Sequence, residues 1–247
     1  MGEVIRTEEQ RTALLLGEPA IKILHHSTVV VCGVGGVGSY AAEALSRSGI
    51  GHLILIDKDT VDITNLNRQI MAQYDTVGQD KCDVMKQRIE GYNHCCTVDC
   101  IKAFFSKENA SEILHGADYA IDAIDTVSSK LDFMESCRSQ NVPFISSLGM
   151  GNRLDPSKVQ ITDLWSTSGD PLARCVREQA RKRQLSGVIP VLFSSEQPRI
   201  IQHTEINPDG ATRKDRIPPA SAMFVPAAAG LLAASSAVRV LLGENIL

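Results

Sequence analysis

The stretch VCGVGGVGSY, from Val31 to Tyr40, decides the fold. It places the pattern Gly33-x-Gly35-x-x-Gly38 directly after a β-branched run and before an Ala-rich segment. Gly33 permits a tight turn, Gly35 lets the backbone approach a phosphate, and Gly38 allows close packing of helix on strand. The helix that begins near residue 37 then directs free N–H groups and its positive dipole end at an anion. The pattern therefore predicts a nucleotide-binding turn, which suits a redox dinucleotide and ATP equally well.

Predicted strands and helices alternate around this turn. Apolar runs predict strands at 27–31, 52–57, 96–104, 118–125 and 142–149, with helices between them. Beyond residue 150 we predict a strand at 158–164, a charged helix at 170–184 with Asp170 as its N-cap, a strand at 188–195 and a Pro-rich loop over 194–223. Parallel βαβ units place helices on both faces of a sheet. We therefore predict an α/β fold with a Rossmann-like, mostly parallel sheet, helices on both faces and a mixed carboxyl-terminal half, in one domain over 1–247 with halves at 1–150 and 151–247.

The bulk composition is that of an ordinary globular protein. The 247 residues include 25 basic and 29 acidic side chains, a net charge of −4, so a global basic field for nucleic acid is excluded and only a local patch is possible. The seven cysteines form no C-x-x-C pair, so we expect neither a disulfide framework nor zinc. The amino terminus has no apolar signal segment, which favours a reducing, cytoplasmic location. The apolar segment 222–243 contains Pro226 and Arg239, so a buried helix is favoured, with peripheral membrane contact as the alternative.

Charged side chains after the turn separate the two kinds of nucleotide. Asp57 ends the second predicted strand, where an acid accepts hydrogen bonds from ribose hydroxyls. Arg68 and Lys81 follow it, and their charge suits a triphosphate cleaved between its α- and β-phosphates, because the leaving pyrophosphate gains negative charge. Asp125 ends an apolar run and is suited to Mg²⁺, which takes one or two carboxylates plus phosphate oxygens. These residues favour ATP over NAD.

An ordered set of motifs carries a family resemblance. The motifs are GVGGVGS (33–39), LIDKDTV (55–61), NLNRQ (65–69), VGQDK (77–81) and DAIDT (122–126). With them the chain resembles the ThiF family of adenylating enzymes, which are related to the ubiquitin-activating enzyme. The resemblance implies a homodimer in which Arg11 of each subunit reaches the partner's ATP site. It also implies that Arg11, Arg68, Lys81 and Asp125 are catalytic, that Asp125 holds Mg²⁺, and that ATP is bound by Gly33, Gly35, Gly36, Gly38, Asp57, Asp59, Asn65, Arg68 and Lys81.

Further stretches resemble the branch of this family that acts on threonylcarbamoyladenosine in tRNA. They are RTALLLGE (11–18), NLNRQI (65–70), DAIDTVSSK (122–130), LDPSKVQITDL (154–164) and DPLAR (170–174). The resemblance implies that ATP converts the side-chain carboxylate to an acyl-adenylate with release of pyrophosphate, and that a nitrogen atom of the same modification then closes a ring and expels AMP. Residues 1–150 would bind ATP, and residues 151–247 would bind the substrate and form the dimer. An internal nucleophile has a large effective molarity, so no catalytic cysteine is needed.

Three alternatives stay open at this point. An adenylyltransferase that activates the carboxyl-terminal Gly of a ubiquitin-like sulfur-carrier protein commonly carries two C-x-x-C zinc pairs, whereas here Leu172 stands at the first Cys position and Cys175 remains alone. An NAD-dependent dehydrogenase would not need Arg68, Lys81 and Asp125. A non-catalytic scaffold is disfavoured because the phosphate-handling residues are all present. A sulfur-transfer partner of the cysteine desulfurase type is a further open possibility.

A basic run in the second half is the candidate contact for tRNA. Arg174, Arg177 and Arg181 are spaced to lie on one helical face. Contacts of basic side chains with phosphates supply much of the affinity of proteins for nucleic acid. The run therefore predicts a local tRNA-binding surface on an otherwise acidic protein. Lys182 and Arg183 adjoin the three arginines, and Lys158, Arg213, Lys214 and Arg216 are candidates to extend the surface.

Overall fold

One sheet runs through the whole molecule. A computed structural model describes residues 8–200 and 219–247. Its strands are β1 (Thr28–Cys32), β2 (His52–Ile56), β3 (Thr97–Ile101), β4 (Tyr119–Asp122), β5 (Phe144–Ser147), β6 (Val159–Asp163) and β7 (Pro190–Ser194). They lie in the order β3-β2-β1-β4-β5-β7-β6, and every neighbouring pair is parallel except β6–β7. The predicted α/β fold is confirmed, and both halves of the chain contribute strands to the sheet.

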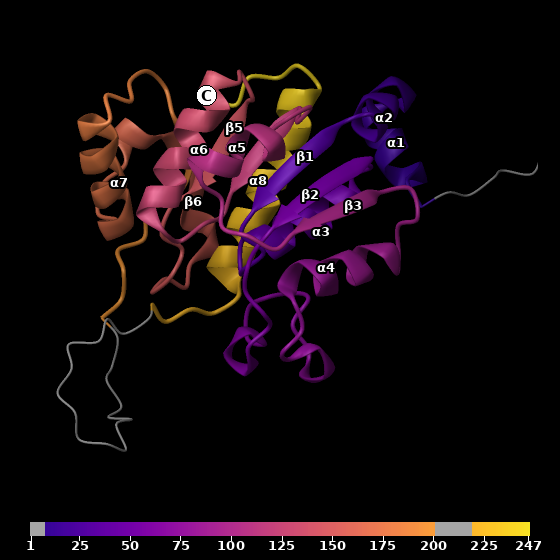
Figure 1. Cartoon of the computed structure of the whole chain (residues 1–247), viewed down its shortest axis with the longest axis horizontal. Coiled ribbons are helices and arrows are strands. Elements are labelled where there is room, and N and C mark those ends of the chain that lie inside the picture. The colour runs from indigo at the N-terminus through magenta and orange to yellow at the C-terminus, as the bar shows by residue number, and fades with distance from the viewer. Residues whose placement is uncertain (1–7, 201–218) are drawn as a thin grey trace, which may run out of the picture.

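Helices cover both faces of the sheet (Figure 1). On one face α3 (Gly38–Arg47), α4 (Lys81–Glu90) and α8 (Phe224–Leu241) enclose one apolar core. On the other face α5 (Lys107–Ile113), α6 (Val127–Ser139) and α7 (Pro171–Lys182) enclose a second core. The central strands β1, β4 and β5 are buried on both faces, which is why their sequences are mostly apolar. Two short helices, α1 (Gln10–Leu16) and α2 (Glu18–His25), precede β1, and 3-10 turns lie at Ile63–Asn65, Tyr74–Thr76, Pro156–Lys158 and Leu164–Ser166.

The apolar segment near the carboxyl terminus forms α8. This helix is long and apolar enough to cross a membrane by composition alone, but half of its most apolar window is buried inside the protein. It packs on α3 so closely that a Cβ added to Gly230 would lie 2.3 Å from the carbonyl oxygen of Val37. The missing side chain of Gly230 makes this approach possible. The close packing on α3 favours the buried-helix interpretation, and membrane contact stays a prediction.

Local capping explains where several helices begin. Ser106 and Asn109 form a capping box before α5. Asp170 caps α7 by accepting a hydrogen bond from the backbone N–H of Ala173 at 2.8 Å. Between β7 and α8 the described residues 195–200 and 219–223 contain no helix or strand, in agreement with the predicted loop. The candidate basic residues Arg213, Lys214 and Arg216 lie outside the described residues.

The fourth strand ends earlier than its sequence predicts. The apolar run continues to Asp125, but β4 ends at Asp122. The reason is the Asp122 side chain, whose Oδ1 accepts a hydrogen bond from the N–H of Ile124 at 2.9 Å and so bends the chain out of the sheet. Residues 123–126 therefore form a turn between β4 and α6, and Asp125 lies in this turn instead of on the strand.

Candidate active site

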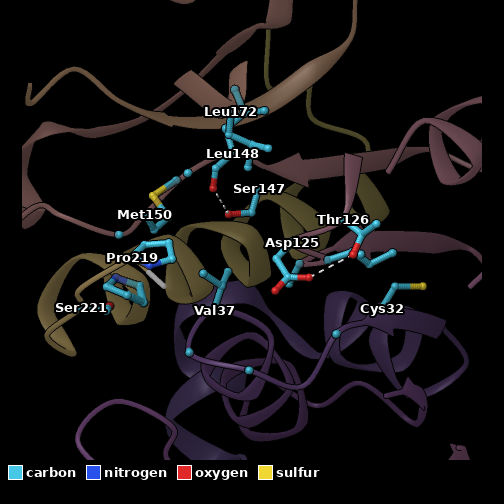
Figure 2. A pocket seen from close by; sticks show the side chains of 18 of the residues that line it. Cys32, Val37, Asp125, Thr126, Ser147, Leu148, Met150, Leu172, Pro219 and Ser221 are labelled. Atoms are coloured by element: carbon cyan, nitrogen blue, oxygen red, sulfur yellow. Dashed lines mark hydrogen bonds between the residues drawn. The ribbon is translucent and has the colours of Figure 1, made fainter. Parts of the chain in front are cut away.

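A pocket of about 670 Å³ opens at the carboxyl ends of the central strands. The strand order reverses between β1 and β4, and open parallel sheets bind ligands at such a switch point. Figure 2 shows Asp125 and Thr126 on one side of the pocket, with Met150, Pro219 and Ser221 on the other. The pocket is lined by Cys32 and the glycine turn, by residues 56–59, 65, 68–69, 81 and 103–105, by the turn 123–126, and by residues 147–153, 170–172, 198, 219, 221 and 226.

The glycine turn is built as predicted, with α3 beginning at its end. Gly33 has φ +89°, and a Cβ at this position would lie 2.7 Å from the carbonyl oxygen of Ala123. A Cβ at Gly38 would lie 1.8 Å from the carbonyl oxygen of Gly33, so the helix can approach the strand only through a glycine. Gly35 lines the pocket, where a Cβ would lie 3.9 Å from Gln69 Nε2, while Gly36 packs between Pro226 and the stem of Arg68. The residues that precede α3 line the pocket, and the free N–H groups at the start of a helix suit an anion.

Asp57 joins the glycine turn to the loop after β2. Its Oδ2 accepts a hydrogen bond from the N–H of Val34 at 2.7 Å, and its Oδ1 accepts one from the N–H of Asp59 at 2.9 Å. Each carboxylate oxygen has a second lone pair, so the same side chain can also accept ribose hydroxyls. The predicted ribose acid therefore lies in the pocket and also holds the phosphate-binding turn.

Lys81 and Asp59 form a pair at the edge of the pocket. Lys81 is the first residue of α4 and is 8% exposed. Its Nζ lies 3.2 Å from Asp59 Oδ2, and its backbone N–H bonds to the carbonyl oxygen of Asp59 at 3.1 Å. Partial burial raises the pKa of Asp59, but the ammonium groups of Lys81 and Lys58 outweigh this effect and hold the pKa below its usual value. A buried cation with one partly exposed counter-ion is well placed to stabilise a polyphosphate.

Asn65 and Arg68 lie in the loop that follows. Asn65 is buried and accepts a hydrogen bond from the N–H of Asp62, which completes the cap of a 3-10 turn. Arg68 lines the pocket, where its Nη1 donates to the carbonyl oxygen of Thr64 and to Asn67 Oδ1, both at 2.9 Å. Its guanidinium has five N–H donors, so these two bonds leave others for a phosphate.

Asp125 is the carboxylate suited to Mg²⁺. Its side chain is exposed in the turn 123–126, and within the described part of the chain its one hydrogen bond is accepted from the hydroxyl of Thr126 at 3.3 Å. Within the described residues no group of three or more His, Cys, Asp or Glu side chains could hold a metal ion. Mg²⁺ is usually held by one or two carboxylates together with phosphate oxygens, so a single free carboxylate beside a phosphate turn fits an ion that arrives with ATP.

Two parts of the pocket are not evident in the sequence. In the lobe beyond β5, the buried side chains of Arg153 and Asp170 pair at 3.0 Å, and Arg153 also donates to the carbonyl oxygen of Gly149 at 2.5 Å. At the opposite edge, Phe104 lies 57% exposed with the Lys58 ammonium 4.2 Å from its ring centroid. An exposed aromatic ring beside the ribose acid suits a nucleobase. Of the residues in these two parts, the sequence pattern singles out only Asp170, and it does so as a helix N-cap and not as a pocket residue.

The predicted basic surface is only partly free. On α7, Arg174, Arg181 and Lys182 are exposed, and Arg174 pairs with Glu178 on the same helix at 2.9 Å. Arg177 donates to the hydroxyl of Thr167. Arg183 pairs with Asp132 at 2.5 Å and Glu135 at 3.3 Å. Arg181 lies over the ring of Trp165, and Lys158 is exposed on the 3-10 turn before β6.

Arg11 lies outside the pocket of its own chain. It is exposed on α1, and α1 and α2 lead into the amino end of β1, whereas the pocket lies at the carboxyl ends of the strands. A role for Arg11 in ATP binding therefore requires a second copy of the chain.

Together the fold and the pocket define a class, an α/β nucleotide-binding protein with acidic and basic side chains gathered around one phosphate turn. Residues 8–247 match the ThiF family, and the chain belongs to this family, so the predicted membership is confirmed. The tRNA threonylcarbamoyladenosine dehydratase of Bacillus subtilis (strain 168) is 45% identical over 239 residues, which cover 95% of this chain and 94% of that protein.

Two solved structures of the tRNA N6-threonylcarbamoyladenosine dehydratase of Escherichia coli are also similar. The complex with ATP has a TM-score of 0.86 and 34% identity, covering 98% of this chain and 96% of that chain. The complex with AMP has a TM-score of 0.86 and 36% identity, covering 97% and 98%.

Proposed function

We propose that this protein uses ATP to dehydrate and cyclise N6-threonylcarbamoyladenosine in tRNA through a carboxyl-adenylate. The observation that carries the proposal is the pocket itself, which combines a phosphate turn, the ribose acid Asp57, the cations Lys81 and Arg68, and the free carboxylate of Asp125. The identity of 45% to the Bacillus subtilis dehydratase, over nearly the full length of both chains, supports the same substrate.

In the first step the substrate carboxylate attacks the α-phosphorus of ATP. The bond from the α-phosphorus to the bridging oxygen breaks, and pyrophosphate leaves with that oxygen. Lys81 and Arg68 stabilise the charge that develops on the pyrophosphate. Asp125 would hold Mg²⁺, which neutralises phosphate charge when bound.

In the second step a nitrogen atom of the same modification attacks the activated carbonyl carbon and loses its proton, and AMP leaves. The carboxylate oxygen that bonded to phosphorus departs in AMP, so the substrate loses the elements of one water. Both reacting groups lie in one small substituent, so ring closure benefits from a large effective molarity. We assign this substituent to the part of the pocket that is lined by Gly149, Met150 and Leu172.

One experiment tests this proposal. The protein is incubated with ATP, Mg²⁺ and tRNA whose threonylcarbamoyl carboxylate carries ¹⁸O, and nucleosides and AMP are analysed by mass spectrometry. We expect the modified adenosine to lose one water and one ¹⁸O atom to appear in AMP. The control replaces ATP by α,β-methylene ATP, whose α–β bridge resists this cleavage, and should give no product. AMP formed only when a ubiquitin-like sulfur-carrier protein is added would refute the proposal in favour of the adenylyltransferase alternative.

We further propose that the active form is a homodimer in which Arg11 serves the partner's ATP site. The α1 helix supports this, because it exposes Leu14 and Leu15, each 82% exposed, beside Arg11. Mixing two inactive variants tests it. Arg11→Ala and Lys81→Met should each be inactive as homodimers, but the mixed dimer contains one site with both side chains and should regain activity. Activity that stays at background after mixing and subunit exchange would contradict the shared site.

Other partners follow as secondary proposals. The exposed residues Arg174, Arg181 and Lys182 on α7 support a local contact with tRNA phosphates. If this contact forms, replacing Arg181 and Lys182 by Ala should raise KM for tRNA and leave KM for ATP unchanged. The cytoplasmic location, a sulfur-transfer partner and the absence of zinc stay predictions.

A further inference from the structure

A fully buried ion pair lies directly beneath the turn that carries Asp125. The side chains of Lys130 and Asp122 are both 0% exposed, and Lys130 Nζ lies 2.7 Å from Asp122 Oδ2. Ser146, on the neighbouring strand β5, donates its hydroxyl to the same oxygen, and Lys130 Nζ lies 3.4 Å from this hydroxyl. We call Asp122, Lys130 and Ser146 the buried triad. None of these three side chains lines the pocket, so the reaction does not use them directly.

The buried triad controls the shape of the turn 123–126. The second oxygen of the Asp122 carboxylate, Oδ1, accepts a hydrogen bond from the N–H of Ile124 at 2.9 Å. Lys130 is the fourth residue of α6, and its own N–H bonds to the carbonyl oxygen of Thr126 at 3.0 Å. The ion pair thus ties the end of β4 to the first turn of α6, and the four residues between them cannot shift without breaking a buried bond.

The other side of the same turn rests on the phosphate-binding turn. The N–H of Ala123 bonds to the carbonyl oxygen of Cys32 at 2.7 Å, and a Cβ on Gly33 would lie 2.7 Å from the carbonyl oxygen of Ala123. The turn is therefore held between the glycine turn on one side and the buried triad on the other. Its position relative to the phosphates of a bound nucleotide depends on both contacts.

Fold stability alone does not require such a pair. Removing two charges from water is costly, and apolar residues of similar volume often replace a buried ion pair without loss of stability. Burial raises the pKa of Asp122, whereas Lys130 and Ser146 act to lower it, so the carboxylate depends on these donors to stay ionised. The arrangement maintains a charged, directional contact where a simple apolar contact would suffice for packing.

We propose that Lys130, through its ion pair with Asp122, is a positioning residue that holds the Asp125 carboxylate at the distance from the glycine turn that a metal–ATP complex requires. Lys130 touches neither substrate nor nucleotide. Its effect is on the coupling between Mg²⁺ and ATP, because only a correctly placed Asp125 can contribute a carboxylate to an ion already held by the phosphates. The inference rests on the proposed function in taking ATP as the ligand of this pocket.

The test measures binding without tRNA and without turnover. The affinity for α,β-methylene ATP is measured by calorimetry in Mg²⁺ and in EDTA, and the ratio of the two dissociation constants gives the gain due to Mg²⁺. The main variant is the double substitution Asp122→Asn with Lys130→Met, which leaves no unpaired buried charge. We expect the gain due to Mg²⁺ to fall by about 10-fold or to vanish, because loss of a residue that orients a metal ligand typically lowers metal affinity by about 10- to 100-fold, while the affinity in EDTA stays within about 2-fold. Hydrogen exchange at residues 123–126 should be faster, with the rest of the sheet unchanged.

A matched control separates positioning from stability. Arg88→Met removes an ion pair with Glu43 on α3, away from the pocket, and should lower the melting temperature without changing the gain due to Mg²⁺. Ser146→Ala keeps both charges and should reduce the gain due to Mg²⁺ less than the double variant does. If the double variant does not fold, Ser146→Ala provides the test.

Three results would overturn the inference. The first is a gain due to Mg²⁺ that is unchanged in the folded double variant or in Ser146→Ala. The second is an Arg88→Met variant that loses as much of the gain due to Mg²⁺ as the double variant does. The third is an unsubstituted protein whose affinity for α,β-methylene ATP does not rise with Mg²⁺. Because tRNA is absent, a failure of the dehydration assay would leave this result intact, so the two proposals fail separately.

Discussion

Replacing Lys81 by Met should abolish most of the chemistry and leave the fold nearly unchanged. Met keeps the unbranched stem that Lys81 buries at the start of α4, so packing is largely retained. The ion pair that is lost joins Nζ to Asp59 at 3.2 Å, but the Asp59 side chain is 53% exposed. Pairs of this kind contribute about 0–1 kcal/mol, so we expect the melting temperature to fall by no more than about 4 °C.

The expected effect on catalysis is much larger. The Lys81 ammonium is buried at the pocket edge, where it can stabilise the charge that develops on pyrophosphate. Removing one preorganised group of this kind costs about 3–4 kcal/mol, or roughly 100- to 1000-fold in kcat. The assay is AMP formation with ATP and threonylcarbamoylated tRNA at saturation, with the melting temperature measured in parallel.

The same substitution elsewhere on α4 provides the control. Lys86 lies on this helix, pairs with Glu90 at 3.9 Å and does not line the pocket, so Lys86→Met should leave kcat unchanged. If Lys81→Met keeps more than about a tenth of the kcat of the unsubstituted protein, the electrostatic role assigned to Lys81 is wrong. A fall of more than about 8 °C in melting temperature would show that the lysine is instead a structural residue.

Three other substitutions test separate parts of the structure. Gly38→Ala places a Cβ 1.8 Å from a carbonyl oxygen, so we expect at least about 2 kcal/mol of destabilisation and loss of ATP binding, measured by denaturant titration and calorimetry. Phe104→Ala removes an exposed ring that is suited to the nucleobase, so KM for ATP should rise about 5-fold, from a lost contact of about 1 kcal/mol, with kcat unchanged. Burial raises the pKa of Glu43, but Arg88 and Arg47 more than offset this and lower it, so its stabilising effect is present above the ordinary carboxyl pKa of about 4.3 and is lost as the pH falls below that value. The stability difference between the unsubstituted protein and Glu43→Gln should therefore shrink in acid, and equal differences at pH 7 and pH 3 would contradict this assignment.

The sequence was sufficient for the parts of the site that depend on backbone geometry. The glycine turn needs residues without a Cβ, and Asp57 and Lys81 begin or end elements whose apolar patterns are clear. Because each parallel strand ends at the same edge of the sheet, these side chains had to lie close together. The strands of the second half were predicted from their local pattern, since β6 alternates apolar and polar residues and β7 is a short, mostly apolar run.

The charged pairs could not be predicted, because their partners come from distant places in the chain. Arg153 reads as a surface arginine until α7 brings the Asp170 carboxylate to it. Arg177 and Arg183 similarly belong to a predicted basic face, but Thr167 and the acids of α6 engage them in the fold. The helical repeat of a sequence shows which side chains share one face of a helix. It does not show which residues of other elements pack against that face.

The connection between the glycine turn and the turn 123–126 explains why a common phosphate motif can serve different chemistry. The missing Cβ of Gly33 lets the carbonyl oxygen of Ala123 approach the turn, so the same glycine that shapes the phosphate site also fixes how near the end of β4 can come. In a protein that only binds a dinucleotide, the end of β4 needs no charge. Here it carries Asp125 in the pocket and the Asp122–Lys130 pair beneath it. The chemistry at the glycine turn therefore depends on the neighbouring strand, and substitutions at Asp122 or Lys130 should change how metal-bound ATP is held without changing how the glycine turn holds the nucleotide alone.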